Sequence, residues 1–205
     1  VTVVVDGGRI AAIEDGLRAA GAGDEVVDLS DATLMPGWMD MHVHLTSEQS
    51  RRSEIDSIKK GESDRAYDSV VYAERTLLAG FTTVRNQGDQ FNTSIALKRA
   101  TDEGKVKGPR IFTAGRAIGS TGGHADASNP WGPFLTSDDP RLHNVCNGPD
   151  SCREQVRQRY KDGADSIKIM STGGVLSLAK SGTAAQFTDE ELEALISTAH
   201  DYGMK

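Results

Sequence analysis

The sequence predicts an α/β protein, because candidate strands and helices alternate along most of its 205 residues. Four strand–helix units follow the Pro36-Gly37 pair, a rhythm typical of a parallel sheet covered by helices. Residues 1–35 hold only short candidate strands joined by turns. A closed (β/α)8 barrel needs eight units over about 250 residues. From the pattern alone, residues 36–205 are either a small open α/β domain or the first half of a barrel.

The region before Pro36 is predicted to contain three strands. Residues 1–5 and 9–13 flank Asp6-Gly7-Gly8, a signal for a tight β-hairpin. Residues 25–29 form the third candidate strand.

The four units are predicted from the spacing of apolar residues. In the first helix Ala66, Val70, Ala73 and Leu77 form one stripe, and Gly80 suits its C-terminal end. Thr188 and Glu191 form a capping box at the start of the last helix. The predicted strands are residues 39–45, 81–85, 110–113 and 164–170, and the predicted helices are 64–79, 93–103, 151–161 and 189–202.

Charge and hydropathy limit the partners. A net charge of −7 argues against nucleic acid and against an anionic membrane surface. No apolar run approaches the roughly 20 residues that cross a bilayer. The first residues show neither a basic segment nor a cleavage site, although the sequence lacks a starting Met. We therefore expect no membrane partner and a cytoplasmic location.

The sequence contains two cysteines, Cys146 and Cys152. They could pair, but two cysteines without framework spacing favour free or buried thiols. We expect thiols here.

The strongest chemical motif is Asp40-Met41-His42-Val43-His44 at the end of a predicted strand. Side chains alternate along a strand, so Asp40, His42 and His44 share one face, with the two imidazoles about 7 Å apart. Two imidazoles so placed can reach one divalent metal ion. The alternative is a pair of core or surface histidines, because His-x-His also arises by chance.

Lys168 lies inside the otherwise apolar segment 164–170. A parallel strand covered on both faces would bury it, and burial lowers the pKa of an amine. A neutral amine can take up CO₂ to form a carbamate, an anionic oxygen ligand able to bridge two metal ions. The alternative is a lysine that extends to solvent from a strand end.

A long connection, residues 114–149, follows the third predicted strand. Connections of this length are often functional, and this one carries Thr121-Gly122-Gly123-His124 and Trp131-Gly132-Pro133-Phe134. His124 is a candidate active-site residue, the alternative being a surface-loop histidine. His143 and His200 are expected at the surface.

Several segments resemble the amidohydrolase superfamily, in its prolidase/imidazolonepropionase-like branch. The first strand of that superfamily reads Pro-Gly, two apolar residues, Asp-x-His-x-His, as residues 36–44 do here. Residues 80–85, Ser171-Thr172-Gly173-Gly174 and the Gly-Gly-His turn also resemble this branch. Many relatives have Asp where this chain has Asn86, which is not a ligand position.

The resemblance implies a fold. It implies that residues 1–35 are part of a small β-sandwich domain and that residues 36–205 are the N-terminal half of a (β/α)8 TIM barrel.

The resemblance also implies a site. His42, His44 and a Lys168 carboxylated by CO₂ would hold two divalent metal ions, with zinc expected. Lys168 would then be both a metal ligand and a catalytic residue. His124 would bind the substrate and polarise its scissile carbonyl, or stabilise the tetrahedral intermediate.

The implied reaction is hydrolysis of an amide bond in a small peptide or amide, with an Xaa-Pro dipeptide as the expected substrate. A cyclic amide is the alternative substrate. By the resemblance, the superfamily's further histidines on strands five and six and its aspartate on strand eight are expected beyond Lys205. A second possibility is therefore an incomplete N-terminal fragment that binds metal weakly or only assembles with a complementary half. A homo-oligomer is expected at full length.

Overall fold

The computed structural model describes residues 1–132, 143–174, 179 and 181–205, so Pro133 and Phe134 of the long connection lie outside the described residues. The protein is α/β and separates into two compact units, Val1–Pro36 and Gly37–Lys205. In the described part of the chain, no helix combines the length and the apolar character needed to cross a membrane.

The first unit contains a β-hairpin. Strands β1 (Thr2–Asp6) and β2 (Arg9–Glu14) pair antiparallel, and Gly7 and Gly8 turn the chain with φ values of +54° and +74°. Positive φ at both turn positions is the geometry that glycine permits. The prediction of a third strand at residues 25–29 is wrong, since this segment is exposed and has no regular structure. A strand requires a hydrogen-bonded neighbour, and none pairs with it among the described residues.

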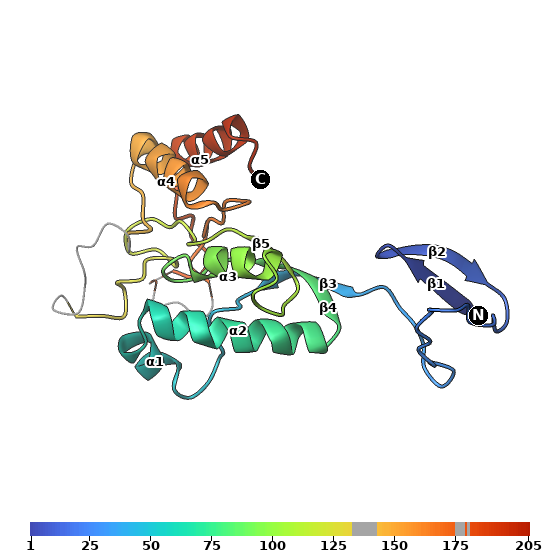
Figure 1. Cartoon of the computed structure of the whole chain (residues 1–205). Coiled ribbons are helices and arrows are strands. Elements are labelled where there is room, and N and C mark those ends of the chain that lie inside the picture. Colours follow the sequence, from blue (N-terminus) through green and yellow to red (C-terminus); the bar gives the residue numbers. More distant parts are fainter. Residues whose placement is uncertain (133–142, 175–178, 180) are drawn as a thin grey trace. The chain divides into compact units, whose positions relative to one another are not determined.

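The second unit is built on a parallel sheet of three strands in the order β3 (Trp38–Val43), β4 (Phe81–Asn86), β5 (Arg110–Thr113). Helices α2 (Glu62–Leu78) and α3 (Thr93–Asp102) lie side by side along it (Figure 1). They share with the sheet a buried cluster that excludes water from one of its faces. Its members are Leu45, Ala73, Val84, Leu97 and Ile111. A short helix that the pattern did not predict, α1 (Ser53–Lys59), precedes α2.

Two further helices form a second cluster. Helices α4 (Pro149–Asp162) and α5 (Asp189–Asp201) pack against each other (Figure 1). Val156 and Leu195 lie fully buried between them, together with Ile118 from the long connection. The predicted capping box is confirmed, because the Glu191 amide donates to the Thr188 hydroxyl and the Thr188 amide donates to the Glu191 carboxylate.

The prediction of a fourth strand at residues 164–170 is wrong, because no strand forms there. The segment lies beside the chain that continues β5, yet forms only an isolated parallel bridge between Ile118 and Ile169. The Asp165 carboxylate accepts a bond from the Thr113 amide at 2.8 Å and pairs with Lys98. A side chain thus occupies a backbone donor that an inter-strand ladder would use. The structure confirms the α/β class, while the four-unit half-barrel stays a prediction.

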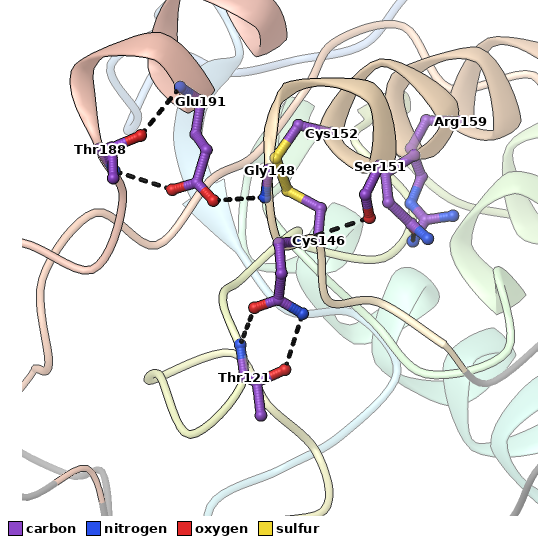
Figure 2. Close-up of a disulfide and its surroundings, with 10 residues drawn as sticks. Thr121, Cys146, Gly148, Ser151, Cys152, Arg159, Thr188 and Glu191 are labelled. Carbon is purple, nitrogen blue, oxygen red and sulfur yellow. Dashed lines mark hydrogen bonds between the residues drawn. A yellow bond between two sulfur atoms is a disulfide. The ribbon is translucent and has the colours of Figure 1, made fainter.

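The two cysteines form a disulfide, so the prediction of free thiols is wrong (Figure 2). Cys146 precedes the Gly148 turn, and Cys152 lies in the first turn of α4. The turn folds the chain back on itself, so that cysteines six residues apart meet. Both are fully buried, which agrees with the expectation of burial.

Candidate metal centre

The end of β3 places His42 and His44 side by side. Their ring centroids lie 5.5 Å apart. Val43, the residue between them, packs against the cluster under α2 and α3, so alternation directs His42 to the opposite face of the sheet. Both histidines are exposed in this chain. The Asp40 carboxylate accepts a 2.9 Å bond from the His42 amide, which ties down the strand end.

The imidazole of His44 has a defined orientation. Its Nδ1 donates to the carbonyl of Gly88, at 2.9 Å, in the loop after β4. This bond places the proton on Nδ1 and leaves the lone pair of Nε2 for a ligand. A backbone carbonyl that orients a histidine in this way is a common feature of metal sites.

Asn86 supports the same loop. It is fully buried, accepts a 2.8 Å bond from the Leu45 amide and donates a 3.4 Å bond to the Gly88 carbonyl. Asn86 therefore links the backbone beside His44 to the carbonyl that orients the imidazole. The resemblance marked Asn86 as a departure from the family pattern but did not indicate that it supports a ligand.

The electrostatic surroundings of His42 suit a metal ligand. Partial desolvation lowers the pKa of His42 below its ordinary value, and the positive charge of Lys168 acts in the same direction. Metal binding requires the neutral imidazole. A divalent ion therefore fits these two histidines, with nitrogen donors that suit zinc.

The positive charge of Lys168 lowers the pKa of His42, so the two side chains lie on the same side of the site. Lys168 is only half-buried, so the prediction of a buried lysine is wrong. The reason is the irregular backbone: the segment joins its neighbour through an isolated bridge at Ile169 and bonds between Asp165 and Thr113, where a full strand would be covered on both faces. Among the described residues, no group of three or more His, Cys, Asp or Glu side chains could hold a metal ion.

His124 lies against the segment that follows Lys168. A Cβ atom added to Gly174 would lie 3.0–3.1 Å from three ring atoms of His124. The ring therefore packs directly against the Gly174 backbone, where a side chain would crowd it. Gly174 also has φ +71°, a conformation that glycine favours. In the described part of the chain, nothing hydrogen-bonds the buried Nδ1 of His124.

The backbone of His124 is held by a residue that the sequence did not single out. Its amide donates to Gln186 Oε1 at 2.8 Å, and the Gln186 amide donates to the Ser171 carbonyl at 3.0 Å. Gln186 thus joins the Gly-Gly-His turn to the chain just beyond Lys168. Spacing alone carries no signal for such a contact. The other two histidines, His143 and His200, are exposed, as expected.

A cavity of about 260 Å³ opens beside His44 at the carboxyl ends of the three strands. It is lined by segments following β3, β4 and β5, including Gly88, and by Arg65 of α2. Burial raises the pKa of Asp89 in its wall, although bonds from Ser94 oppose this. Ligands of barrel enzymes bind at this end of the strands.

Residues 33–205 match the profile of the amidohydrolase family. The chain belongs to that family.

Two solved structures are similar over 98% of this chain. A Xaa-Pro dipeptidase with methionine bound in its active site is 46% identical, with a TM-score of 0.89. A prolidase complexed with N-methylphosphonate-L-proline is 28% identical, with a TM-score of 0.73. This chain covers 50% and 49% of those two chains.

Ochratoxinase of Aspergillus niger is 29% identical over 181 residues, which are 81% of this chain and 36% of that protein. The family member described here thus spans from about a third to half of the length of these relatives.

Proposed function

We propose that this amidohydrolase is a metal-dependent hydrolase of amide bonds that acts on Xaa-Pro dipeptides or closely related ones. The observation that carries the proposal is the pair His42 and His44, with the His44 imidazole oriented by Gly88. The similarity to a Xaa-Pro dipeptidase and a prolidase supports this substrate class. Imidazolonepropionase-like hydrolysis of a cyclic amide stays the alternative.

His42 and His44 would hold the metal through ring nitrogens, and a carboxylated Lys168 would bridge two ions through its carbamate oxygens. Zinc is the expected metal. Such ions lower the pKa of bound water and polarise a carbonyl. Asp40 and Gly88 hold the two histidines in place, at distances suited to hydrogen bonds.

His124 would act on the substrate. Its Nδ1 is buried and free of hydrogen bonds from the described residues, so it is available to a ligand. Gln186 fixes the backbone of this turn, and the glycine at 174 leaves room for the ring. In this role His124 contacts the scissile carbonyl and stabilises charge that develops on its oxygen.

Metal analysis combined with dipeptide hydrolysis tests the proposal. The purified chain is loaded with zinc, dialysed, and assayed for release of proline from Ala-Pro. Turnover that disappears in His42→Ala supports the hydrolase. Metal bound through His42 and His44 without turnover favours the second candidate, an incomplete fragment that needs a complementary half. A chain that binds no zinc contradicts the proposed centre.

Carboxylation of Lys168 has its own test. If the carbamate bridges two ions, removing CO₂ and bicarbonate during zinc loading lowers the bound zinc, and adding bicarbonate restores it. Lys168→Arg keeps the positive charge but forms no such carbamate, so its zinc content should not respond to bicarbonate. An equal response in both proteins would contradict the bridge.

The partners, the oligomeric state and the location of the protein are also proposals. A small peptide or amide is the expected partner, with neither nucleic acid nor membrane, and full-length protein is expected to form a homo-oligomer. A cytoplasmic location stays the prediction from the sequence. The buried disulfide weighs against it, because disulfides persist mainly in oxidising compartments.

A further inference from the structure

The residues just before α4, 144–148, form a strap that touches both the His124 turn and the helix pair. The turn comprises residues 119–125, and Gly119, Gly122 and Gly123 make its backbone pliable. The strap contains one of the two disulfide cysteines. Its contacts show what the disulfide connects.

On one side the strap binds the turn through backbone and side chains. The Gly119 amide donates to the Asn144 carbonyl at 3.0 Å, and the Cys146 amide donates to the Gly119 carbonyl at 2.8 Å. The Asn147 side chain accepts from the Thr121 amide at 3.3 Å and donates to the Thr121 hydroxyl at 2.9 Å (Figure 2). The Asn144 side chain donates to the carbonyls of Ala117 and Ala125.

On the other side the strap is fixed to the helices. The disulfide joins Cys146 to Cys152 in α4. The Gly148 amide donates at 2.6 Å to Glu191, the capping-box residue of α5 (Figure 2). Both cysteines belong to the buried cluster that contains Val156 and Leu195.

We propose that the Cys146–Cys152 disulfide is a clamp that positions the His124 turn over Gly174. The bond fixes Cys146, whose own amide holds Gly119 at one end of the turn, while Asn147 holds Thr121 in its middle. At the other end of the turn, Gln186 accepts a hydrogen bond from the His124 amide and Gly174 packs against the His124 ring. What His124 does once positioned rests on the proposed function, whereas the clamp itself does not.

The alternative is a purely structural disulfide that stabilises the whole second unit and does not affect the conformation of the turn. The two hypotheses predict different regions of increased backbone mobility after the disulfide is reduced. Dithiothreitol passes two electrons and two protons to the bond, which leaves two thiols and the oxidised dithiol. Opening a clamp loosens residues 119–125, whereas loss of a general stabiliser loosens all elements together.

The test is hydrogen exchange by mass spectrometry on the chain with and without reduction, in the absence of metal and substrate. The clamp predicts exchange at least about tenfold faster in residues 119–125 on reduction, while β3, β4 and β5 keep their protection. It also predicts that the NMR contact between the His124 ring and the Gly174 α-protons disappears.

Two variants make the result decisive. Asn147→Ala keeps the disulfide but removes both hydrogen bonds to Thr121, so it should speed hydrogen exchange in residues 119–125. This variant tests the contact with the turn even if the reduced chain unfolds. Leu97→Ala destabilises the cluster under α2 and α3 and should leave the His124–Gly174 contact intact. An unchanged turn after reduction, or loosening spread evenly over the chain, overturns the clamp. Because no catalysis is measured, failure of the proposed hydrolysis would not alter either outcome.

Discussion

The carbonyl of Gly88 accepts two hydrogen bonds that together orient a candidate metal ligand. His44 donates one through Nδ1, and the buried side-chain amide of Asn86 donates the other. Asn86 also accepts a bond from the Leu45 amide, so it fixes the backbone on which His44 lies. A single residue at the end of β4 thus supports both the backbone beside His44 and the carbonyl that sets its tautomer.

Asn86→Asp should weaken zinc binding to the chain about 10-fold or more, because outer contacts of a metal ligand typically contribute that much. The carboxylate cannot donate to Gly88 and would repel its carbonyl oxygen. Isothermal titration with zinc measures the affinity. Thr113→Val, on the neighbouring strand β5, removes a buried hydroxyl contact to Ser94 of α3 and serves as the control. Equal affinity in all three proteins would contradict the role of Asn86.

At the scale of elements, the start of α5 depends on a carboxylate. Glu191 accepts bonds from the amides of Gly148 and Thr188, which hold the pKa of Glu191 below its usual value. A lowered pKa in the folded state means that the carboxylate stabilises the fold above its unfolded pKa of 4.5. That stabilisation is lost as the pH falls through the lower, folded value.

Glu191→Gln should therefore lower the free energy of unfolding by about 1 kcal/mol at pH 7, the usual contribution of a helix cap. The difference from the unmodified chain should shrink as the pH falls below 4.5, where the unmodified chain loses its own carboxylate. Thermal unfolding followed by circular dichroism at pH 7 and pH 3 measures both. Glu190→Gln removes the same charge in the same turn and should show neither effect, while a pH-independent loss would refute the argument.

Local signals explain which elements the sequence could predict. The apolar stripe of α2 and the capping box of α5 are contained in a few neighbouring residues, and both helices form within one or two residues of their predicted bounds. Residues 25–29 have the composition of a strand, but composition does not determine whether another strand lies beside them to form hydrogen bonds. The segment around Lys168 is irregular because Asp165 bonds to Thr113, 52 residues earlier in the chain.

The same distinction applies to the candidate site. The spacing of His42 and His44 follows from strand alternation, so the sequence could place them together. The contacts of Gly88 with His44, of Gln186 with His124 and of Cys146 with Cys152 depend on how loops fold back. Neither periodicity nor composition encodes such contacts.

For the whole molecule, the disulfide ties stability to the redox state. Closing a short loop of this kind contributes roughly 2 kcal/mol. Trypsin digestion of alkylated, unreduced chain should give one peptide, residues 142–153, that holds both cysteines and takes up alkyl groups only after reduction. Chain made in a reducing cytoplasm should instead carry alkylated thiols and unfold at a lower temperature. Free thiols in chain made under oxidising conditions would contradict the bond.

The face of the sheet opposite α2 and α3 determines how the chain behaves in solution. Ile111 is buried against those helices, so its neighbour Phe112 lies on the other face, as His42 does next to Val43. Phe112 is 45% exposed and Trp38 is 58% exposed, and β3 and β5 are the edges of the described sheet. Apolar side chains beside unpaired strand edges favour association between copies.

The chain should therefore self-associate at micromolar concentration, and Phe112→Ser should shift it toward monomer. Sedimentation velocity measures the distribution, and zinc affinity should be unaffected because Phe112 lies two strands from His42. Tyr67→Ser removes a side chain from a residue that is 77% exposed on α2 and is the matched control. If both variants shift the monomer–oligomer distribution equally, the change reflects a more polar surface in general and not the exposed sheet face. A monomeric unmodified chain would show that the exposed sheet face does not drive association.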